Sequence, residues 1–117
     1  MMRKLFFIGL ITLFFYFWLG NAYSMRIITT EDNNSRIIIP STESFKVVLS
    51  GDPMKGFNCI TKIEPEGLIR LKDMDMDFEK GEMIYIYQPI SSGDVVLRYM
   101  CEEGEQKREY IFNISIH

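Results

Sequence analysis

The stretch Asp94-Val95-Val96-Leu97-Arg98-Tyr99-Met100-Cys101 carries apolar side chains at every second position from Val95 to Cys101. The same period of two holds in 43–49, and again in 110–116 at the C-terminus. A period of two places alternate side chains on one face of a β-strand, whereas an amphipathic helix has a period of 3.6. These three segments are therefore predicted to be strands with one face on a core.

Further strands are predicted near residues 25–30, 35–39, 58–64, 67–72 and 82–88. The segments between them are rich in Gly, Pro, Asn, Asp and Ser, which are the residues of turns. No stretch has the pattern of an amphipathic helix. About eight short strands predict an all-β protein, specifically an immunoglobulin-like antiparallel β-sandwich.

The first 24 residues have the pattern of a secretory signal peptide. Arg3 and Lys4 form a basic head, residues 5–20 are an apolar run, and cleavage is predicted after Ser24. A retained membrane anchor is the alternative, but the run is shorter than the ~20 apolar residues that span a bilayer. We expect a signal peptide at 1–24, one domain at 25–117, and a protein that is periplasmic, secreted or endolysosomal, depending on its source.

The predicted mature chain is acidic, with 16 Asp and Glu against 11 Lys and Arg once Arg3 and Lys4 are removed, a net charge of −5. It has no basic stripe of the kind that holds phosphates, which argues against a nucleic-acid partner. After residue 24 no apolar run is long enough to enter a membrane. We expect a soluble monomer.

Cys59 and Cys101 are the only cysteines. Each shares the parity of the apolar residues of its strand, so both should face inward, and an exported chain favours a disulfide between them. Two free buried thiols remain the alternative. A catalytic thiol would need a base, and the sole histidine is His117 at the C-terminus. A structural zinc site usually has four Cys or His ligands, and this chain has only three such residues. We expect no enzyme activity, no metal and no cofactor.

The acidic stretch Asp73-Met74-Asp75-Met76-Asp77 has alternate carboxylates, as the start of a calcium-binding loop does. The rest of that pattern is missing, because Phe78 stands where a glycine is needed and Ile84 where a bidentate glutamate is needed. We predict an acidic, solvated edge or loop that discourages edge-to-edge pairing of sheets.

The loop Asp52-Pro53-Met54-Lys55-Gly56-Phe57 resembles the Asn-Pro-Thr-Thr-Gly-Phe/Tyr loop of the chagasin family, exported or lysosomal β-sandwich inhibitors of papain-like cysteine peptidases. Residues 78–87 are similar to that family's glycine-rich loop and the strand after it. Residues 93–100 look like the strand before its Arg-Pro-Trp loop, and 108–114 like its closing strand. The chain departs from the family at Met54 and Lys55, which replace two threonines, and at 101–103, where Cys-Glu-Glu replaces Arg-Pro-Trp.

The resemblance implies a reversible, non-covalent inhibitor whose loops at 51–57, 77–82 and 101–106 gather at one end and occlude the cleft of a papain-like cysteine peptidase. Pro53 and Gly56 stiffen the first loop, so little entropy is lost on docking. A Cys59–Cys101 bridge would clamp the base of the first loop to the base of the last. The implied contacts with the peptidase come from all three loops: Asp52, Pro53, Met54, Lys55, Gly56, Phe57, Lys80, Gly81, Glu102 and Glu103.

The alternative function is an exported immunoglobulin-like binding or assembly module that does not inhibit peptidases. It is favoured by the altered third loop, which lacks the family's aromatic anchor. Asn33 and Asn113 fit the acceptor pattern for N-glycosylation, which applies only in a eukaryotic secretory route.

Overall fold

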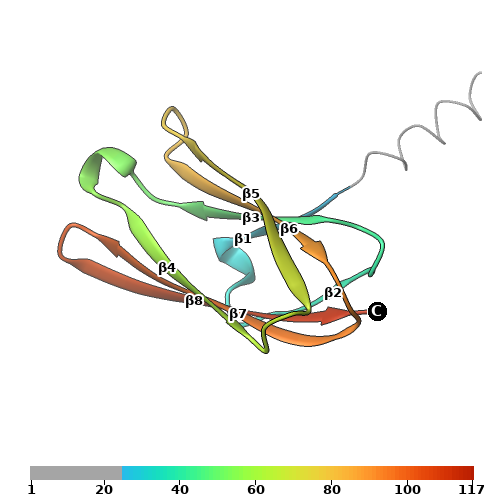
Figure 1. Ribbon diagram of the computed structural model, residues 1–117. Coiled ribbons are helices and arrows are strands. Elements are labelled where there is room, and N and C mark those ends of the chain that lie inside the picture. The colour runs from blue at the N-terminus through green and yellow to red at the C-terminus, as the bar shows by residue number, and fades with distance from the viewer. Residues whose placement is uncertain (1–24) are drawn as a thin grey trace, which may run out of the picture.

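Eight strands form two four-stranded sheets in the computed structural model, which describes residues 25–117 (Figure 1). The predicted signal peptide lies outside the described residues. Sheet A has the order β1-β3-β6-β5 and sheet B the order β2-β8-β7-β4. The strands are β1 (Arg26–Thr29), β2 (Arg36–Ile39), β3 (Phe45–Ser50), β4 (Asn58–Glu64), β5 (Ile69–Asp77), β6 (Glu82–Pro89), β7 (Gly93–Glu103) and β8 (Gln106–Ile116). The predicted all-β sandwich is confirmed.

The sheets are mixed rather than wholly antiparallel, which corrects one detail of the prediction. β1 pairs with β3 in parallel and β2 pairs with β8 in parallel, while the other four strand pairs are antiparallel. A short 3-10 turn, η1 (Thr30–Asp32), carries the chain from β1 in sheet A to β2 in sheet B. Side-chain period shows which face of a strand is buried but not the direction of its neighbour, so the sequence could not reveal this pairing.

The core fills the space between the inner faces of the two sheets. Val95, Leu97, Tyr99 and Cys101 of β7 are each at most 2% exposed. Other buried residues come from most of the remaining strands, among them Phe45, Val47 and Leu49 of β3, Tyr85 and Tyr87 of β6, and Tyr110, Phe112, Ile114 and Ile116 of β8. The period of two therefore identifies the inward side chains of β3, β7 and β8, the three strands from which the fold is predicted.

A cluster of tyrosines links the two sheets inside this core. The hydroxyls of Tyr87 and Tyr99 are 2.6 Å apart, and the Tyr85 and Tyr99 ring centroids are 4.9 Å apart. Burial raises the pKa of Tyr87 to about 12 and also raises the pKa of Tyr99. Both hydroxyls are therefore neutral at physiological pH, and the hydrogen bond between them satisfies two buried polar groups.

Besides β7, which extends into the predicted third loop, two strands run well beyond their predicted ends. β5 runs to Asp77, through the acidic stretch, and β8 begins at Gln106. The added parts are mostly exposed on both faces, so they lack the alternation of apolar and polar residues from which strands are predicted.

The acidic stretch forms the outer half of edge strand β5. Asp73 Oδ1 accepts the backbone N–H of Met74 (2.9 Å), and Asp75 Oδ1 accepts that of Met76 (2.8 Å). These carboxylates place charge and hydrogen-bond acceptors along an edge that has β6 as its neighbour on one side. The predicted acidic edge is present, and such an edge discourages pairing with another sheet.

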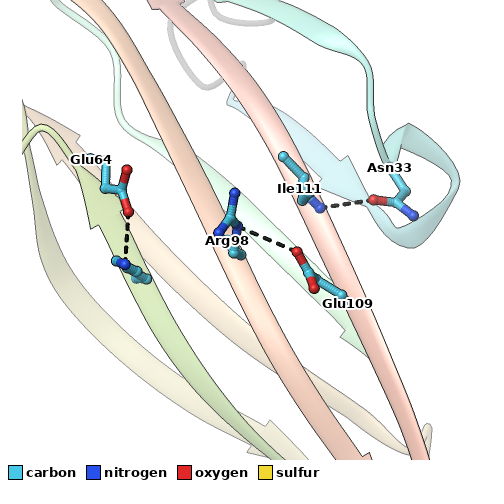
Figure 2. A network of polar contacts seen from close by, with 6 residues as sticks. Asn33, Glu64, Arg98, Glu109 and Ile111 are labelled. Carbon is cyan, nitrogen blue, oxygen red and sulfur yellow. Dashed lines mark hydrogen bonds and ion pairs between the residues drawn. The ribbon is translucent and has the colours of Figure 1, made fainter.

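A polar network covers part of the outer face of sheet B (Figure 2). Asn33, beyond η1, accepts the backbone N–H of Ile111 through Oδ1 at 2.8 Å. Arg98 Nε lies 3.4 Å from Glu109 Oε1, and Lys62 Nζ lies 3.0 Å from Glu64 Oε1. Lys62 lowers the pKa of the exposed Glu64 carboxyl. The Lys62–Glu64 pair is exposed and contributes little to stability, whereas the Asn33 bond fixes the turn against β8.

Candidate functional site at one end of the sandwich

Three chain connections meet at one end of the molecule. Ser50 of β3 pairs with Glu82 of β6, and Asn58 of β4 pairs with Glu102 of β7. These pairs place the first loop (51–57) beside the second loop (78–81) on one side and the third loop (104–105) on the other. All three lie at the left of Figure 1. The structure thus brings the three sequence-predicted loops together.

The first loop is held in shape by its own hydrogen bonds. Asp52 precedes the 3-10 turn η2 (Pro53–Lys55) and accepts the N–H of Met54 through Oδ1 at 3.0 Å, while the Asp52 carbonyl accepts the N–H groups of Lys55 and Phe57. Gly56 closes the turn at φ +77°, a left-handed conformation that glycine adopts without strain. The loop is therefore stiff, with its polar backbone largely satisfied.

The tip and the base of the first loop differ in exposure. Met54 is 82% exposed at the tip, and Lys55 beside it is exposed too. Phe57, predicted to contact the peptidase, is buried in the core at 6% exposure, so that prediction is corrected: its side chain supports the loop from below. A Cβ on Gly51 would lie 2.3 Å from the Phe57 ring, which explains the glycine at that position.

The second loop is a tight turn joined to the first. Asp77 Oδ1 accepts the N–H groups of Glu79 and Lys80, both at 3.1 Å. The carbonyl of Gly81 accepts the N–H of Gly51 at 2.8 Å. Phe78 is 64% exposed in this turn. The sequence does not predict this exposure, because an aromatic residue beside an acidic stretch lacks the alternating pattern that shows whether a side chain is buried.

The third loop is shorter than predicted. β7 continues to Glu103 and β8 begins at Gln106, which leaves a two-residue turn with Gly104 at φ +62°. Glu102 and Glu103, predicted as loop residues, thus belong to β7. Glu102 is exposed and lies 3.9 Å from Lys107 Nζ, whereas Glu103 Oε2 accepts the backbone N–H of Asp52 at 3.3 Å. The two glutamates therefore have different roles.

The predicted disulfide is present. Cys59 and Cys101 are directly opposed on β4 and β7, with Cα atoms 4.0 Å apart and an S–S distance of 2.08 Å. They join neighbouring strands of one sheet at the foot of the first and third loops. Cys101 is buried and Cys59 is half-buried. The alternative of two free thiols is therefore wrong.

The sole histidine lies at the other end of the sandwich. Ser115 Oγ donates to Asp94 Oδ1 at 2.8 Å and lies 2.8 Å from His117 Nε2. On β8, Arg108 lies opposite Cys101 and Ile116 lies opposite Gly93, so most of the strand separates His117 from the disulfide. They cannot act together as a base and a nucleophile.

The described residues show neither a metal cluster nor a membrane-spanning helix. Residues 25–117 contain no group of three or more His, Cys, Asp or Glu side chains arranged to hold a metal ion. Within the same range no helix is long and apolar enough to cross a membrane.

The comparisons with known proteins give matches by structure alone. No protein-family model and no curated protein sequence matches the chain. The cysteine protease inhibitor EhICP2 from Entamoeba histolytica has a similar structure, with a TM-score of 0.70 and 15% identity over 80% of this chain and 95% of that one. Amebosin matches with a TM-score of 0.55 and 13% identity, over 80% and 99% of the two chains. A structure of PbICP-C in complex with falcipain-2 matches with a TM-score of 0.58 and 9% identity, over 80% and 92%.

These likenesses concern the fold. Each match covers 92% or more of the other protein's chain, so the described domain corresponds to nearly the whole of each of those structures. The expected chagasin-like sandwich is therefore the fold of this chain. Because the sequence identities are low, the structural similarity gives no information on the loop residues. The function must therefore be argued from the site itself.

Proposed function

We propose that the protein is a reversible, non-covalent inhibitor of papain-like cysteine peptidases, and that its three-loop end covers the peptidase's active-site cleft. The observation that carries this proposal is the first loop. It is stiff, its tip is exposed at Met54 and Lys55, and it projects between two flanking loops. A protruding, pre-shaped loop can enter a cleft without the entropy loss that a flexible loop would incur.

Occlusion of a cleft needs shape and not reactive groups. Both cysteines are joined in the disulfide, and the proposed contact surface consists of backbone, Pro53, Met54 and charged side chains. Two of the structures with this fold support a peptidase partner: one is described as a cysteine protease inhibitor, and another is a complex with falcipain-2. We propose that Asp52, Pro53, Met54, Lys55 and Gly56 occupy the cleft.

The flanking loops would border the cleft through Lys80, Gly81 and Glu102. Glu102 and the neighbouring Glu105 are exposed carboxylates. They favour a peptidase with basic side chains near this border, since complementary charge speeds association. We further propose that the protein is exported by its N-terminal segment and acts as a monomer.

Substitution of Met54 tests this proposal most simply. Met54→Ala removes the exposed tip, and loss of a central anchor of this kind typically weakens binding by ~2 kcal/mol, about 30-fold. Ile38→Ala is the matched control, because Ile38 is also exposed, at 66%, but lies far from the three loops. It pairs with Ser115 near the end of β8, at the opposite end of the sandwich. Equal inhibition constants for the two variants would contradict the proposed role of the first loop.

The second candidate function is a binding or assembly module without inhibition. It is favoured by the hairpin of β7 and β8 that carries the third loop. There Glu102 and Glu103 offer a partner no aromatic anchor. In that case neither variant would inhibit any papain-like peptidase, although both would be folded.

A further inference from the structure

Besides the backbone bond from Gly51 to Gly81, the first loop has one side-chain link that its own residues do not supply. The N–H of Asp52 donates to Glu103 Oε2 at 3.3 Å, and the two residues are 51 positions apart in the sequence. Asp52 is the residue that caps η2 and whose carbonyl accepts two further N–H groups of the loop. Whatever fixes Asp52 therefore fixes the direction in which the whole turn projects.

A second link holds the other side of the loop. Cys59 follows Phe57 by two residues and is bonded to Cys101, which precedes Glu103 by two residues. The last three residues of β7 thus hold the loop at its start, through Asp52, and just past its end, through Cys59. β4 is the outer strand of sheet B and pairs with β7 on one side, so its first residues depend on this attachment.

The surroundings of Glu103 differ from those of its acidic neighbours. Glu103 is half-buried, and its carboxylate is directed to the first loop, whereas Glu102 and Glu105 are exposed. A carboxylate that accepts a backbone N–H forms a stronger bond than a neutral acceptor does. Such a carboxylate is less available for an ion pair with a partner.

We propose that Glu103 is a positioning residue, and that together with the Cys59–Cys101 disulfide it clamps the first loop in its binding shape. The predicted effect on inhibition rests on the proposed function, whereas the predicted effect on the shape of the loop does not. Glu103 then acts through Asp52 and makes no contact of its own with the peptidase. The sequence-based assignment of Glu103 to the contact surface is replaced by this role.

Amide hydrogen exchange of the first loop tests the clamp without any peptidase. Glu103→Ala removes the acceptor, and we expect exchange in 52–57 to become about tenfold faster, the effect of losing one hydrogen bond to a charged group. Glu103→Gln retains an acceptor oxygen and should exchange nearly as slowly as the parent protein. Glu66→Ala, at an exposed glutamate in the connection from β4 to β5 and so away from the three loops, is the control. Unchanged exchange in Glu103→Ala would overturn the proposal.

Inhibition by the same variants separates positioning from direct contact. If Glu103 positions the loop, Glu103→Ala weakens inhibition of a papain-like peptidase about tenfold while Glu103→Gln stays close to the parent. If Glu103 instead forms an ion pair with the peptidase, both variants weaken inhibition equally, and the proposal is wrong.

The disulfide half of the clamp is tested in the same way. Cys59→Ala/Cys101→Ala should speed exchange in 52–57 and weaken inhibition even at temperatures where the fold is intact. Slow exchange in this double variant would contradict the second link. If the parent protein inhibits no peptidase, the proposed function fails, and the exchange measurements still decide the clamp.

Discussion

Gly56 is the residue on which the backbone of the first loop most depends. Its φ of +77° is left-handed, and a β-branched side chain is strongly disfavoured there. An added Cβ would meet no atom within 4 Å, so the expected effect of a substitution is conformational and not a clash.

We predict that Gly56→Val distorts the turn and weakens inhibition, whereas Gly56→Asn is tolerated because asparagine enters the left-handed region more easily. Both variants should keep the parent's melting temperature within a few degrees, since the site is exposed. The measurement is the inhibition constant. Equal constants for Val and Asn would show that the loop's backbone shape does not matter for binding.

At the level of single residues, the sequence predicted positions better than roles. Pro53 and Gly56 were recognisable because their backbone preferences are intrinsic. The burial of Phe57 and the bond from Glu103 to Asp52 depend on segments far apart in the chain, which no local pattern reveals. The turn that leaves Phe78 exposed is shaped locally by Asp77, and only the bond from Gly51 to Gly81 ties it to a distant segment.

Among the elements, the β4–β7 pair carries the disulfide. The two cysteines are 42 positions apart, and closing a loop of that length stabilises by about 4 kcal/mol in the chain-entropy model. We predict that Cys59→Ala/Cys101→Ala lowers the melting temperature by roughly 10 °C or more. Thermal unfolding followed by circular dichroism under oxidising conditions measures this, and an unchanged melting temperature would contradict the clamp's contribution to stability.

The edge strand β5 gives a second prediction at this scale. Asp73→Ala/Asp75→Ala frees the N–H groups of Met74 and Met76, which the two carboxylates now accept, and removes two charges from the edge. We expect this variant to self-associate with rising concentration, as unprotected edge strands do. Light scattering coupled to size-exclusion chromatography measures the effect.

Asp73→Asn/Asp75→Asn is the control, because the amide retains an acceptor oxygen but carries no charge. Association of the Ala variant alone would assign the protection to the hydrogen bonds, and association of both would assign it to charge. If both remain monomeric, the acidic edge does not prevent pairing.

For the strands, the sequence predicted existence and parity well and boundaries less well. Strands with one buried face, such as β3 and β7, show the period of two from which they were predicted. The outer parts of β5 and β8 project beyond the core and are solvated, so hydrophobic pattern carries no information about them.

At the scale of the whole molecule, the tyrosine cluster makes stability depend on alkaline pH. The pKa of Tyr87 is raised to about 12 in the folded protein, against about 10 in an unfolded chain. Between these values the unfolded chain loses protons that the folded one retains, so stability is fully present below pH ~10 and falls as the pH rises towards 12. Burial raises the pKa of Tyr99 and Tyr85 as well, which adds to the same loss.

We therefore predict that tyrosinate absorbance of these buried residues appears together with loss of the β-sheet signal in an alkaline titration. Tyr87→Phe is the informative variant, because it removes one titrating hydroxyl and leaves Tyr99 without its hydrogen-bond partner. It should be less stable at pH 7 but lose less stability between pH 10 and 12. Titration of all tyrosines near pH 10 with the fold intact would contradict the account.

The central claim is that the first loop occludes the cleft of a papain-like cysteine peptidase. It is tested most directly by steady-state inhibition of several such peptidases with the purified protein, across a range of peptide-substrate concentrations. The account predicts inhibition that is competitive with substrate, reversed by dilution, and accompanied by recovery of the intact, uncleaved chain. Full peptidase activity at high micromolar concentrations of the folded, disulfide-bonded protein would contradict it.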